Sequence, residues 1–484
     1  MELLWTDWCF LLMLIAGFGL LVNGLRHENT RSAVHRLLQQ PMALCSAIIL
    51  LFFILIGVLD SIHMKTSAST DKSLERVGQI YSVLDKIMAP LGQLYEKTYS
   101  MPLALNLFTT ETVFQDGRVQ QIYPRLKYPP ASMQTEADKG AFISRVLWKA
   151  LLASLGLVGL VYVVIAGIKR LGEYIGLWSS GKPEPGMHSD VPRLDRGIHE
   201  ISARRQITKR YFYSRFIWGW ATLFCCLFLV LASYWISREL HLFGTGKIGQ
   251  DIFYHTIKSI RTGLIIGTVT TLFMLPLAII LGVAAGYFGG VVDDIIQYIY
   301  TTLSSIPGVL LITASVLSMQ TYIVNHPERF TTLDKSADAR LLALCLILGV
   351  TSWTSLCRLL RAEVLKLREI DFVNAARTLG SGFVYIFRKH LLPNVMPIVL
   401  ITLVLDFSFL ILAEAVLSYV GVGVSPLTIS WGNMINGARL ELANEPMVWW
   451  PIMAAFIFMF VLVLASNIFA DAVRDVFNPD NAVN

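Results

Sequence analysis

Nine long apolar segments constrain this chain more than any other feature of its 484 residues. Each is close to the roughly 20 residues that an α-helix needs to cross the hydrocarbon core of a bilayer. In addition, 55% of the residues are hydrophobic and only 15% are charged. The chain is therefore expected to be an all-α polytopic membrane protein, with spans at about 8–23, 42–59, 143–168, 216–236, 262–288, 295–319, 341–357, 395–420 and 447–470.

Loop charges predict which ends of the spans face the cytoplasm, because Lys and Arg near span ends are held on that side. Residues 169–215 include ten Lys or Arg against five Asp or Glu, and residues 358–394 include seven against three. Both loops are expected to be cytoplasmic, which for nine spans places the N-terminus outside and the C-terminus in the cytoplasm. The first span lacks a basic n-region and a small-residue cleavage site, so we expect a retained helix.

The composition argues against several other classes of protein. The net charge of +6 is explained by basic loops facing anionic lipid, so no nucleic-acid partner is expected. All six cysteines lie in or beside apolar segments without a C-x-x-C pair. We therefore expect no disulfide framework, no metal site and no cofactor bound by this chain.

Composition also divides the chain near residue 215. The N-terminal extension comprises two helices within 1–60, an extracytoplasmic domain at 61–142, a third helix at 143–168 and a basic cytoplasmic linker at 169–215. The six-span core occupies 216–476, and a short tail follows at 477–484. In the extracytoplasmic domain, apolar residues from Leu74 to Leu94 recur at three- and four-residue steps, which predicts one amphipathic helix about twenty residues long.

The loop at 362–394 has a defined pattern of small residues, a glycine and a proline. Residues 373–379 predict a short helix whose paired alanines leave a low surface against which another protein can pack. Gly380 suits the left-handed conformation that ends a helix, and Pro393 is expected to stop a second amphipathic turn over 383–392. The pattern predicts a docking element or, on a plainer interpretation, a helical hairpin with alanines for internal packing.

This loop resembles the EAA loop of ABC-importer permeases, whose pattern is E-A-A-x3-G-x9-I-x-L-P. The alanines, the glycine and the final Leu-Pro match this pattern, whereas an asparagine replaces the usual Glu and a histidine the usual Ile. With this histidine, the end of the loop resembles the H-x-L-P-N sequence of the peptide and nickel branch of the family. By this resemblance, the residues expected to dock an ATPase are Asn374, Ala375, Ala376, Arg377, Gly380, His390, Leu392 and Pro393.

Other segments resemble OppC/DppC-type permeases of the same branch. Residues 241–251 are similar to the signature H-x-F-G-T-D-x-x-G-R-D, with Gly246 and Gln250 in place of Asp and Arg. Residues 413–423 and 430–434 are similar to A-E-A-x-L-S-F-L-G-L-G and S-W-G-x-M. The first segment does not match a phosphate-binding loop, so we interpret it as an extracytoplasmic turn shaped by His241, Gly244, Thr245, Gly249 and Asp251.

Two features of the spans are candidates for a role in transport. The fifth span has G-x-x-x-G pairs at 263/267 and 282/286, which permit close approach of either a partner permease or another helix of this chain. Asp406 and Glu414 lie eight residues apart on the eighth span, where a carboxylate facing lipid is costly. They are candidates for a polar pathway or gate, and Asp406 is the better one. For Glu414, a carboxylate satisfied by neighbouring hydroxyls is the favoured interpretation.

The resemblance implies an inner-membrane permease subunit of a bacterial ABC importer, and not an enzyme in itself. Its partners would be a second homologous permease, two ABC ATPase subunits that bind ATP and Mg, an extracytoplasmic solute-binding protein and membrane lipid. Oligopeptides or dipeptides are the expected cargo, although nickel chelates and antimicrobial peptides fit the same residues. ATPase motion would reach the spans through the coupling helix in 373–379 and alternate the access of the pathway.

Two other classes of protein use similar features. An ion-coupled carrier or channel could use the two intramembrane carboxylates without an ATPase, and ATP dependence of uptake would distinguish it. A membrane enzyme would need a nucleophile and base or metal ligands, whereas His63, His188 and His199 are scattered through loops. The N-terminal extension lies outside the resemblance and could dock a binding protein, brace a partner permease or add a regulatory surface.

Overall fold

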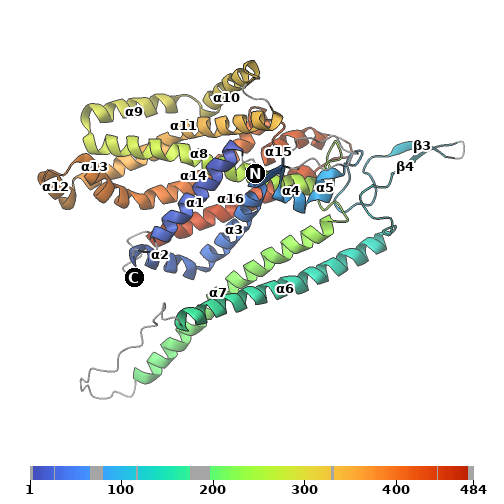
Figure 1. Cartoon of the computed structure of the whole chain (residues 1–484), viewed down its shortest axis with the longest axis horizontal. Helices are drawn as coiled ribbons and strands as arrows, with labels where there is room; N and C mark the ends of the chain where they lie inside the picture. Colours follow the sequence, from blue (N-terminus) through green and yellow to red (C-terminus); the bar gives the residue numbers. More distant parts are fainter. Residues whose placement is uncertain are drawn as a thin grey trace.

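The computed structural model describes residues 4–24, 26, 28–65, 80–115, 118–174, 197–328, 332–443 and 445–477. Within these ranges, nine helices are long and apolar enough to cross a membrane, as the apolar segments predict. The helices form an elongated bundle, and the long α6–α7 pair extends from one side of it (Figure 1). The chain is thus a multi-pass, almost entirely helical membrane protein.

The N-terminal extension contributes helices and two small antiparallel sheets. The first sheet pairs β1 with β2 and the second pairs β3 with β4. The elements are α1 (Trp5–Gly24), α2 (Glu28–Gln39), α3 (Pro41–Ser61), β1 (His63–Lys65), β2 (Ile80–Ser82), α4 (Val83–Ile87), α5 (Ala89–Gln93), β3 (Glu111–Gln115), β4 (Arg118–Ile122) and α6 (Glu136–Tyr174).

The six-span core begins within α7 and ends with α16. Its elements are α7 (Gly197–Ser237), α8 (Ile252–Phe288), α9 (Gly290–Ser305), α10 (Gly308–Asn325), α11 (Leu333–Arg368), α12 (Asp371–Thr378), α13 (Phe383–Ile386), a π-helical turn (Phe387–Leu391), α14 (Leu392–Val420), α15 (Trp431–Arg439), a 3-10 turn (Glu441–Ala443) and α16 (Trp450–Phe477). We call the two ends of the bundle the α12 end and the α15 end (Figure 1).

One predicted span is wrong. The span at 295–319 is broken at Ile306, which is extended because the following Pro307 disfavours helical backbone there; α10 supplies the span instead. Within the predicted linker at 169–215, α6 continues to Tyr174 and α7 begins at Gly197, and 175–196 lies outside the described residues.

The predicted amphipathic helix at 74–94 is also wrong from residue 80 onward, and its earlier part lies outside the described residues. A strand and two short helices replace it. Ser82 starts α4 with a capping box in which its hydroxyl accepts from the Asp85 backbone N–H, and Pro90 lies at the start of α5. These capping residues start new short helices at Ser82 and Pro90, and they outweigh the three- and four-residue spacing of apolar residues that predicted one continuous helix.

The centre of the bundle is α8, which packs along α11 and also contacts α1, α3 and α14. A Cβ at Gly282 would lie 2.8 Å from the backbone oxygen of Cys357, and one at Gly286 would lie 2.8 Å from that of Arg361. A Cβ at Gly267 would lie 2.4 Å from the ring of Phe407. Both G-x-x-x-G pairs therefore serve packing within this chain, so the alternative of a partner permease on these faces is wrong.

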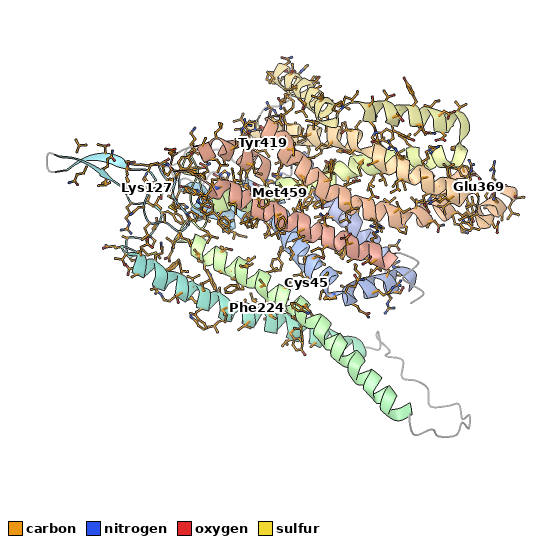
Figure 2. The ribbon with its side chains drawn as sticks, turned by 180° about the vertical axis from the view of Figure 1, so that it is seen from behind. Cys45, Lys127, Phe224, Glu369, Tyr419 and Met459 are labelled. Atoms are coloured by element: carbon orange, nitrogen blue, oxygen red, sulfur yellow. The ribbon has the colours of Figure 1, made fainter. Side chains whose placement is uncertain are left out.

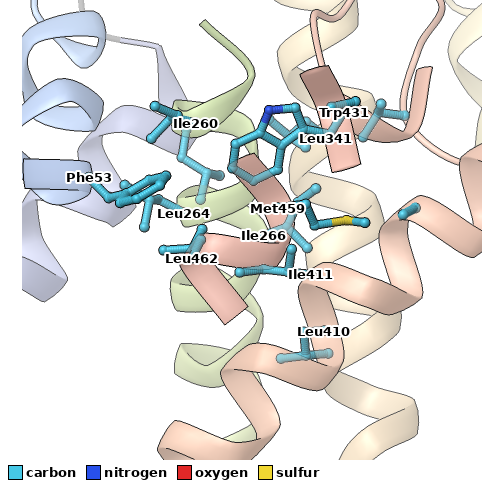
Figure 3. Packing of buried hydrophobic residues seen from close by; sticks show 14 of the residues in the cluster. Phe53, Ile260, Leu264, Ile266, Leu341, Leu410, Ile411, Trp431, Met459 and Leu462 are labelled. Carbon is cyan, nitrogen blue, oxygen red and sulfur yellow. The ribbon is translucent and has the colours of Figure 1, made fainter. Parts of the chain in front are cut away.

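The N-terminal extension shares the hydrophobic centre of the six-span core. Phe53 of α3 belongs to the same buried cluster as Ile260, Leu264 and Trp431 of the core (Figure 3). Gly57 of α3 is so close to α8 that a Cβ there would lie 2.6 Å from the Leu264 side chain. Through α3, the extension is consequently packed against the core and is not a separate domain beside it.

Candidate functional site

The α12 helix at one end of the bundle is anchored by its inward face. Val373 and Ala376 are buried in the cluster that also holds Ile386 and Leu391. The helix ends on Gly380, whose φ of 78° is the left-handed conformation that the sequence predicts. The Gly380 N–H donates to the Arg377 carbonyl at 3.0 Å and the Ser381 N–H to the Ala376 carbonyl at 3.1 Å, which closes the last turn.

The outward face of α12 differs from the expectation in one respect. Ala375 and Arg377 are exposed, whereas Ala376 packs inside this chain, so the two alanines do not present a common surface to a partner. Consecutive residues of an α-helix point about 100° apart, and positions 373 and 376 share the inward side. The large apolar side chains on the outward side of this loop are instead those of Leu379, which is 85% exposed, and Phe372, which is 42% exposed.

The second half of the loop contains a further correction. Pro393 does not stop the helix, because α13, the π-helical turn and α14 form one continuous helical path from Phe383 to Val420. Pro393 lies in the first turn of α14, where a missing N–H is tolerated. The ring of His390 lies 5.7 Å from that of Phe372, so the histidine links the π-helical turn to α12.

The remaining docking candidates have minor local contacts. The Asn374 side-chain amide donates to the backbone oxygen of Glu369 at 3.2 Å, and Leu392 is half-buried. Glu369 marks the α12 end in Figure 2. The loop is thus a helix with an exposed outer face, held against the bundle by buried Val373 and by the aromatic contact of His390.

Sequence reasoning missed the contacts that join this loop to the long helices. The ring of Phe383 lies 4.7 Å from that of Phe288 and 5.1 Å from that of Tyr287, at the end of α8. Nearby, Arg361 of α11 donates two hydrogen bonds to Asp293 of α9, one of them at 2.6 Å. These hydrogen bonds hold the pKa of the Asp293 carboxyl below its usual range. The partners are 68 or more positions apart, so no local pattern reveals them.

At the α15 end, the turn at 241–251 is organised around a buried histidine. The Nδ1 of His241 lies 2.6 Å from Asp251, and its Nε2 lies 3.8 Å from Glu96 of the N-terminal extension. The side chain is fully buried, and the ring of Tyr128 lies 4.6 Å from the imidazole ring. Burial by itself would lower the pKa of His241, but the two carboxylates outweigh it and raise the pKa to about 9.

The other predicted residues of this turn dock it onto the extension. Gly244 has a φ of 71° and Gly249 a φ of 75°, and a Cβ at either would lie within 2.2 Å of a backbone oxygen of the segment 96–100. The Thr245 hydroxyl donates to the backbone oxygen of Thr98 at 2.8 Å. Asp251 also begins α8, where its carboxylate accepts from the Tyr254 backbone N–H at 2.7 Å. The turn is therefore the place where the N-terminal extension packs against the six-span core.

Gly246 and Gln250, which replace a charged pair of the family pattern, still lie against each other. A Cβ at Gly246 would lie 2.6 Å from the Gln250 side-chain nitrogen, and the Gln250 amide oxygen accepts from the Ile248 N–H at 3.1 Å. The pair is neutral, and the hydrogen bond of the Gln250 amide oxygen holds the turn closed.

The two carboxylates of α14 have different surroundings. Glu414 is 3% exposed, and its Oε1 accepts from the hydroxyls of Ser418 at 2.7 Å and Ser430 at 3.0 Å. A Cβ at Gly432 would lie 2.7 Å from the same oxygen, so only glycine fits there. Glu414 thus joins α14 to α15, in agreement with the interpretation of a satisfied carboxylate.

Asp406 has no such partners. Its Oδ2 is buried without a hydrogen-bond donor in the part of the chain that the structure describes. A carboxylate oxygen in this state is destabilising unless a proton, water or ligand compensates it. Asp406 therefore stays the candidate pathway residue of the two.

Comparison with known proteins finds a family match within the C-terminal half of the chain. Residues 278–482 match the family described as "Binding-protein-dependent transport system inner membrane component". The chain is 31% identical over 243 residues to the dipeptide transport system permease protein DppC of Lactococcus lactis subsp. cremoris, which covers 50% of this chain and 65%, just under two thirds, of that protein. It is 30% identical to the oligopeptide transport system permease protein OppC of Bacillus subtilis over 49% of this chain and 72% of that protein. A putative peptide permease of Brucella suis is also 30% identical, over 50% of this chain and 74% of that protein.

Proposed function

This chain belongs to the family of binding-protein-dependent transport system inner membrane components, the permeases of ABC transporters, and we propose that it is a peptide-importing permease that receives ATPase motion through α12. Relatives named as dipeptide and oligopeptide permeases support this cargo. The proposed partners are a second homologous permease, two ABC ATPases that bind ATP and Mg, and an extracytoplasmic solute-binding protein. The proposed orientation places the α12 end and the C-terminus in the cytoplasm, with the N-terminus outside.

The single observation that carries the proposal is the construction of α12. Its outer face presents Leu379, Phe372 and Ala375 to solvent, although α12 lies in a loop where exposed apolar residues gain nothing from lipid or from the chain's own core. Its inner face packs against α11 and α13, in a buried cluster that also includes residues of α8 and α14. A helix that is fixed by a buried side and has apolar residues at three- and four-residue steps among the polar residues of its exposed side is suited to docking in a groove of another protein.

Motion of a docked α12 has a defined route into the bundle. The Phe383 ring contacts the rings of Tyr287 and Phe288, so a displacement of the loop pushes the end of α8. The helical path that begins at Phe383 continues through α14 and includes Asp406. A rigid-body movement of the ATPase would thus act on the central helix and on the pathway candidate together.

The test is copurification of the ATPases with the full-length chain from a membrane extract. We expect Leu379→Asp and Ala375→Asp to abolish recovery of the ATPases, because each introduces a charge on the exposed face without disturbing the buried one. Ile248→Asp is the matched control, since Ile248 is 67% exposed and lies in the turn at the α15 end.

Recovery of the ATPases with both Asp variants would contradict the assignment of α12 as the docking element. Peptide uptake into vesicles should also require ATP inside the vesicles. Uptake that persists without ATP and responds to an ion gradient would favour the alternative of an ion-coupled carrier that uses Asp406.

A further inference from the structure

A cavity of about 190 Å³ lies between the N-terminal extension and the six-span core, beside the loop that precedes α15. It lies apart from Asp406 and α12, and the proposed transport function does not use it. Both parts of the chain line it with ionisable groups: Asp60, His63 and Asp85 from the extension, and Lys258, Arg261 and Asp338 from the core. Such a concentration of charge at an internal junction requires compensation.

The two permanent cations of the cavity are each already paired. Arg261 donates to the Oδ1 of Asp7 through Nε at 2.9 Å and through Nη2 at 2.6 Å. The Lys258 ammonium lies 2.6 Å from Asp85. Asp338 accepts from the backbone N–H of Trp5 at 2.9 Å, at the start of α1. The guanidinium of Arg261 and the ammonium of Lys258 are therefore already paired with the carboxylates of Asp7 and Asp85.

Asp60 is left with an unfilled acceptor. Its side chain is 1% exposed, and its Oδ1 accepts from the Ser82 hydroxyl at 2.6 Å. Its Oδ2 has no hydrogen-bond partner in the described part of the chain, and neither has the buried hydroxyl of Thr428, which lines the same cavity. Buried polar atoms are ordinarily satisfied, so two free ones on a single cavity indicate a missing partner.

The charge balance defines the sign of that partner. Among the described residues, the carboxylates of Asp60, Asp85 and Asp338 in the cavity and of Asp7 beside it outnumber the basic side chains that face them, which are Lys258, Arg261 and His63. An occupant that carries a positive charge and several hydrogen-bond donors would complement it. A primary ammonium group has three N–H donors and no acceptor.

We propose that this cavity binds a primary ammonium group, with Asp60 as its anionic acceptor and Thr428 as a second acceptor. Among the described residues, no three His, Cys, Asp or Glu side chains are grouped to hold a metal ion, which favours an organic cation over a divalent metal. Because Asp60 belongs to the extension and Thr428 to the core, a bound ammonium group contacts both parts. Binding in the cavity therefore stabilises the packing of the extension against the core.

Thermal unfolding of the purified full-length protein in detergent tests this inference. The probe is n-propylammonium chloride, compared with n-propyltrimethylammonium chloride and sodium chloride at equal ionic strength. We expect a concentration-dependent rise of the melting temperature with n-propylammonium alone, because a ligand that binds the folded state stabilises it and a quaternary cation has no N–H to donate.

Two variants localise the effect. Asp60→Asn keeps the shape of the side chain but removes its charge, and it should weaken the response to n-propylammonium by roughly ten-fold or more. Thr428→Val removes one acceptor and should weaken it less; it also carries the test if Asp60→Asn fails to fold through loss of the Ser82 contact. Asp371→Asn, on an exposed carboxylate at the α12 end, is the control and should respond as the unaltered chain does.

The ammonium group could belong to a soluble amine or to an aminophospholipid headgroup. A smaller response in nanodiscs of phosphatidylethanolamine than in nanodiscs of phosphatidylglycerol would identify the lipid, since the site would already be filled, and an equal response would identify a soluble amine. Equal effects of the three salts, or an undiminished response in both cavity variants, would overturn the proposal and leave water as the occupant.

Discussion

The buried histidine at the joint between extension and core makes the stability of this protein depend on pH. His241 has its pKa raised from an ordinary value of 6.5 to about 9. At 1.36 kcal/mol for each pH unit, this difference corresponds to about 3 kcal/mol of stabilisation by the protonated ring. Because the folded-state pKa is the higher one, the stabilisation is complete below pH 6.5 and is lost as the pH rises through 9.

Hydrogen exchange measures this stabilisation locally. Amides of 241–251 and of 96–101 should lose roughly 100-fold of their protection between pH 6.5 and pH 9.5, after correction for the intrinsic pH dependence of exchange, which is the equivalent of about 3 kcal/mol. His241→Gln should abolish the pH dependence and exchange faster at pH 6.5. His326→Gln is the control, because His326 is only partly buried at the end of α10 and has no carboxylate contact in the described residues. Protection that is flat between these pH values, or that falls equally in His241→Gln, would refute the assignment of a charged histidine.

Two further predictions concern the carboxylates of α14. Gly432→Ala should lower the free energy of unfolding by about 1–3 kcal/mol, because the added methyl group overlaps the carboxylate of Glu414; Gly437→Ala, with nothing within 4 Å of the new Cβ, is the matched control, and equal melting temperatures for the two variants would contradict the prediction. Asp406→Asn should reduce peptide uptake while raising stability by about 1–3 kcal/mol, because it removes the charge of a carboxylate whose buried oxygen lacks a partner. Unchanged uptake in Asp406→Asn would remove this residue from the pathway.

The structure bears on the three hypotheses for the N-terminal extension. Phe53 lies in the central hydrophobic cluster, Gly57 touches Leu264, and Glu96 lies beside His241. The contacts of α3 with α8 and α16 cover one side of the core. Deletion of 1–210 would uncover these surfaces, so loss of transport in that deletion could not by itself identify a receptor-docking role.

The sequence determined the features that depend on local composition and spacing. Apolar length alone predicts the spans, because a helix of about 20 apolar residues is the means of crossing a bilayer. The glycine at 380 predicts the end of α12, because its backbone conformation is unfavourable for other residues. The match of the core to permeases follows from motifs of contiguous residues.

Only the tertiary structure decided which face of each element meets another part of the chain. In the tertiary structure Ala376 faces inward, Glu414 accepts from Ser418 and Ser430, and one carboxylate oxygen each of Asp406 and Asp60, Oδ2, has no donor among the described residues. It also brought Glu96 to His241 across 145 positions of sequence, a distance over which no periodicity extends. The reason is that burial and pairing arise from the summed packing of many helices, and a side chain's partners in that packing are not encoded by its neighbours in the chain.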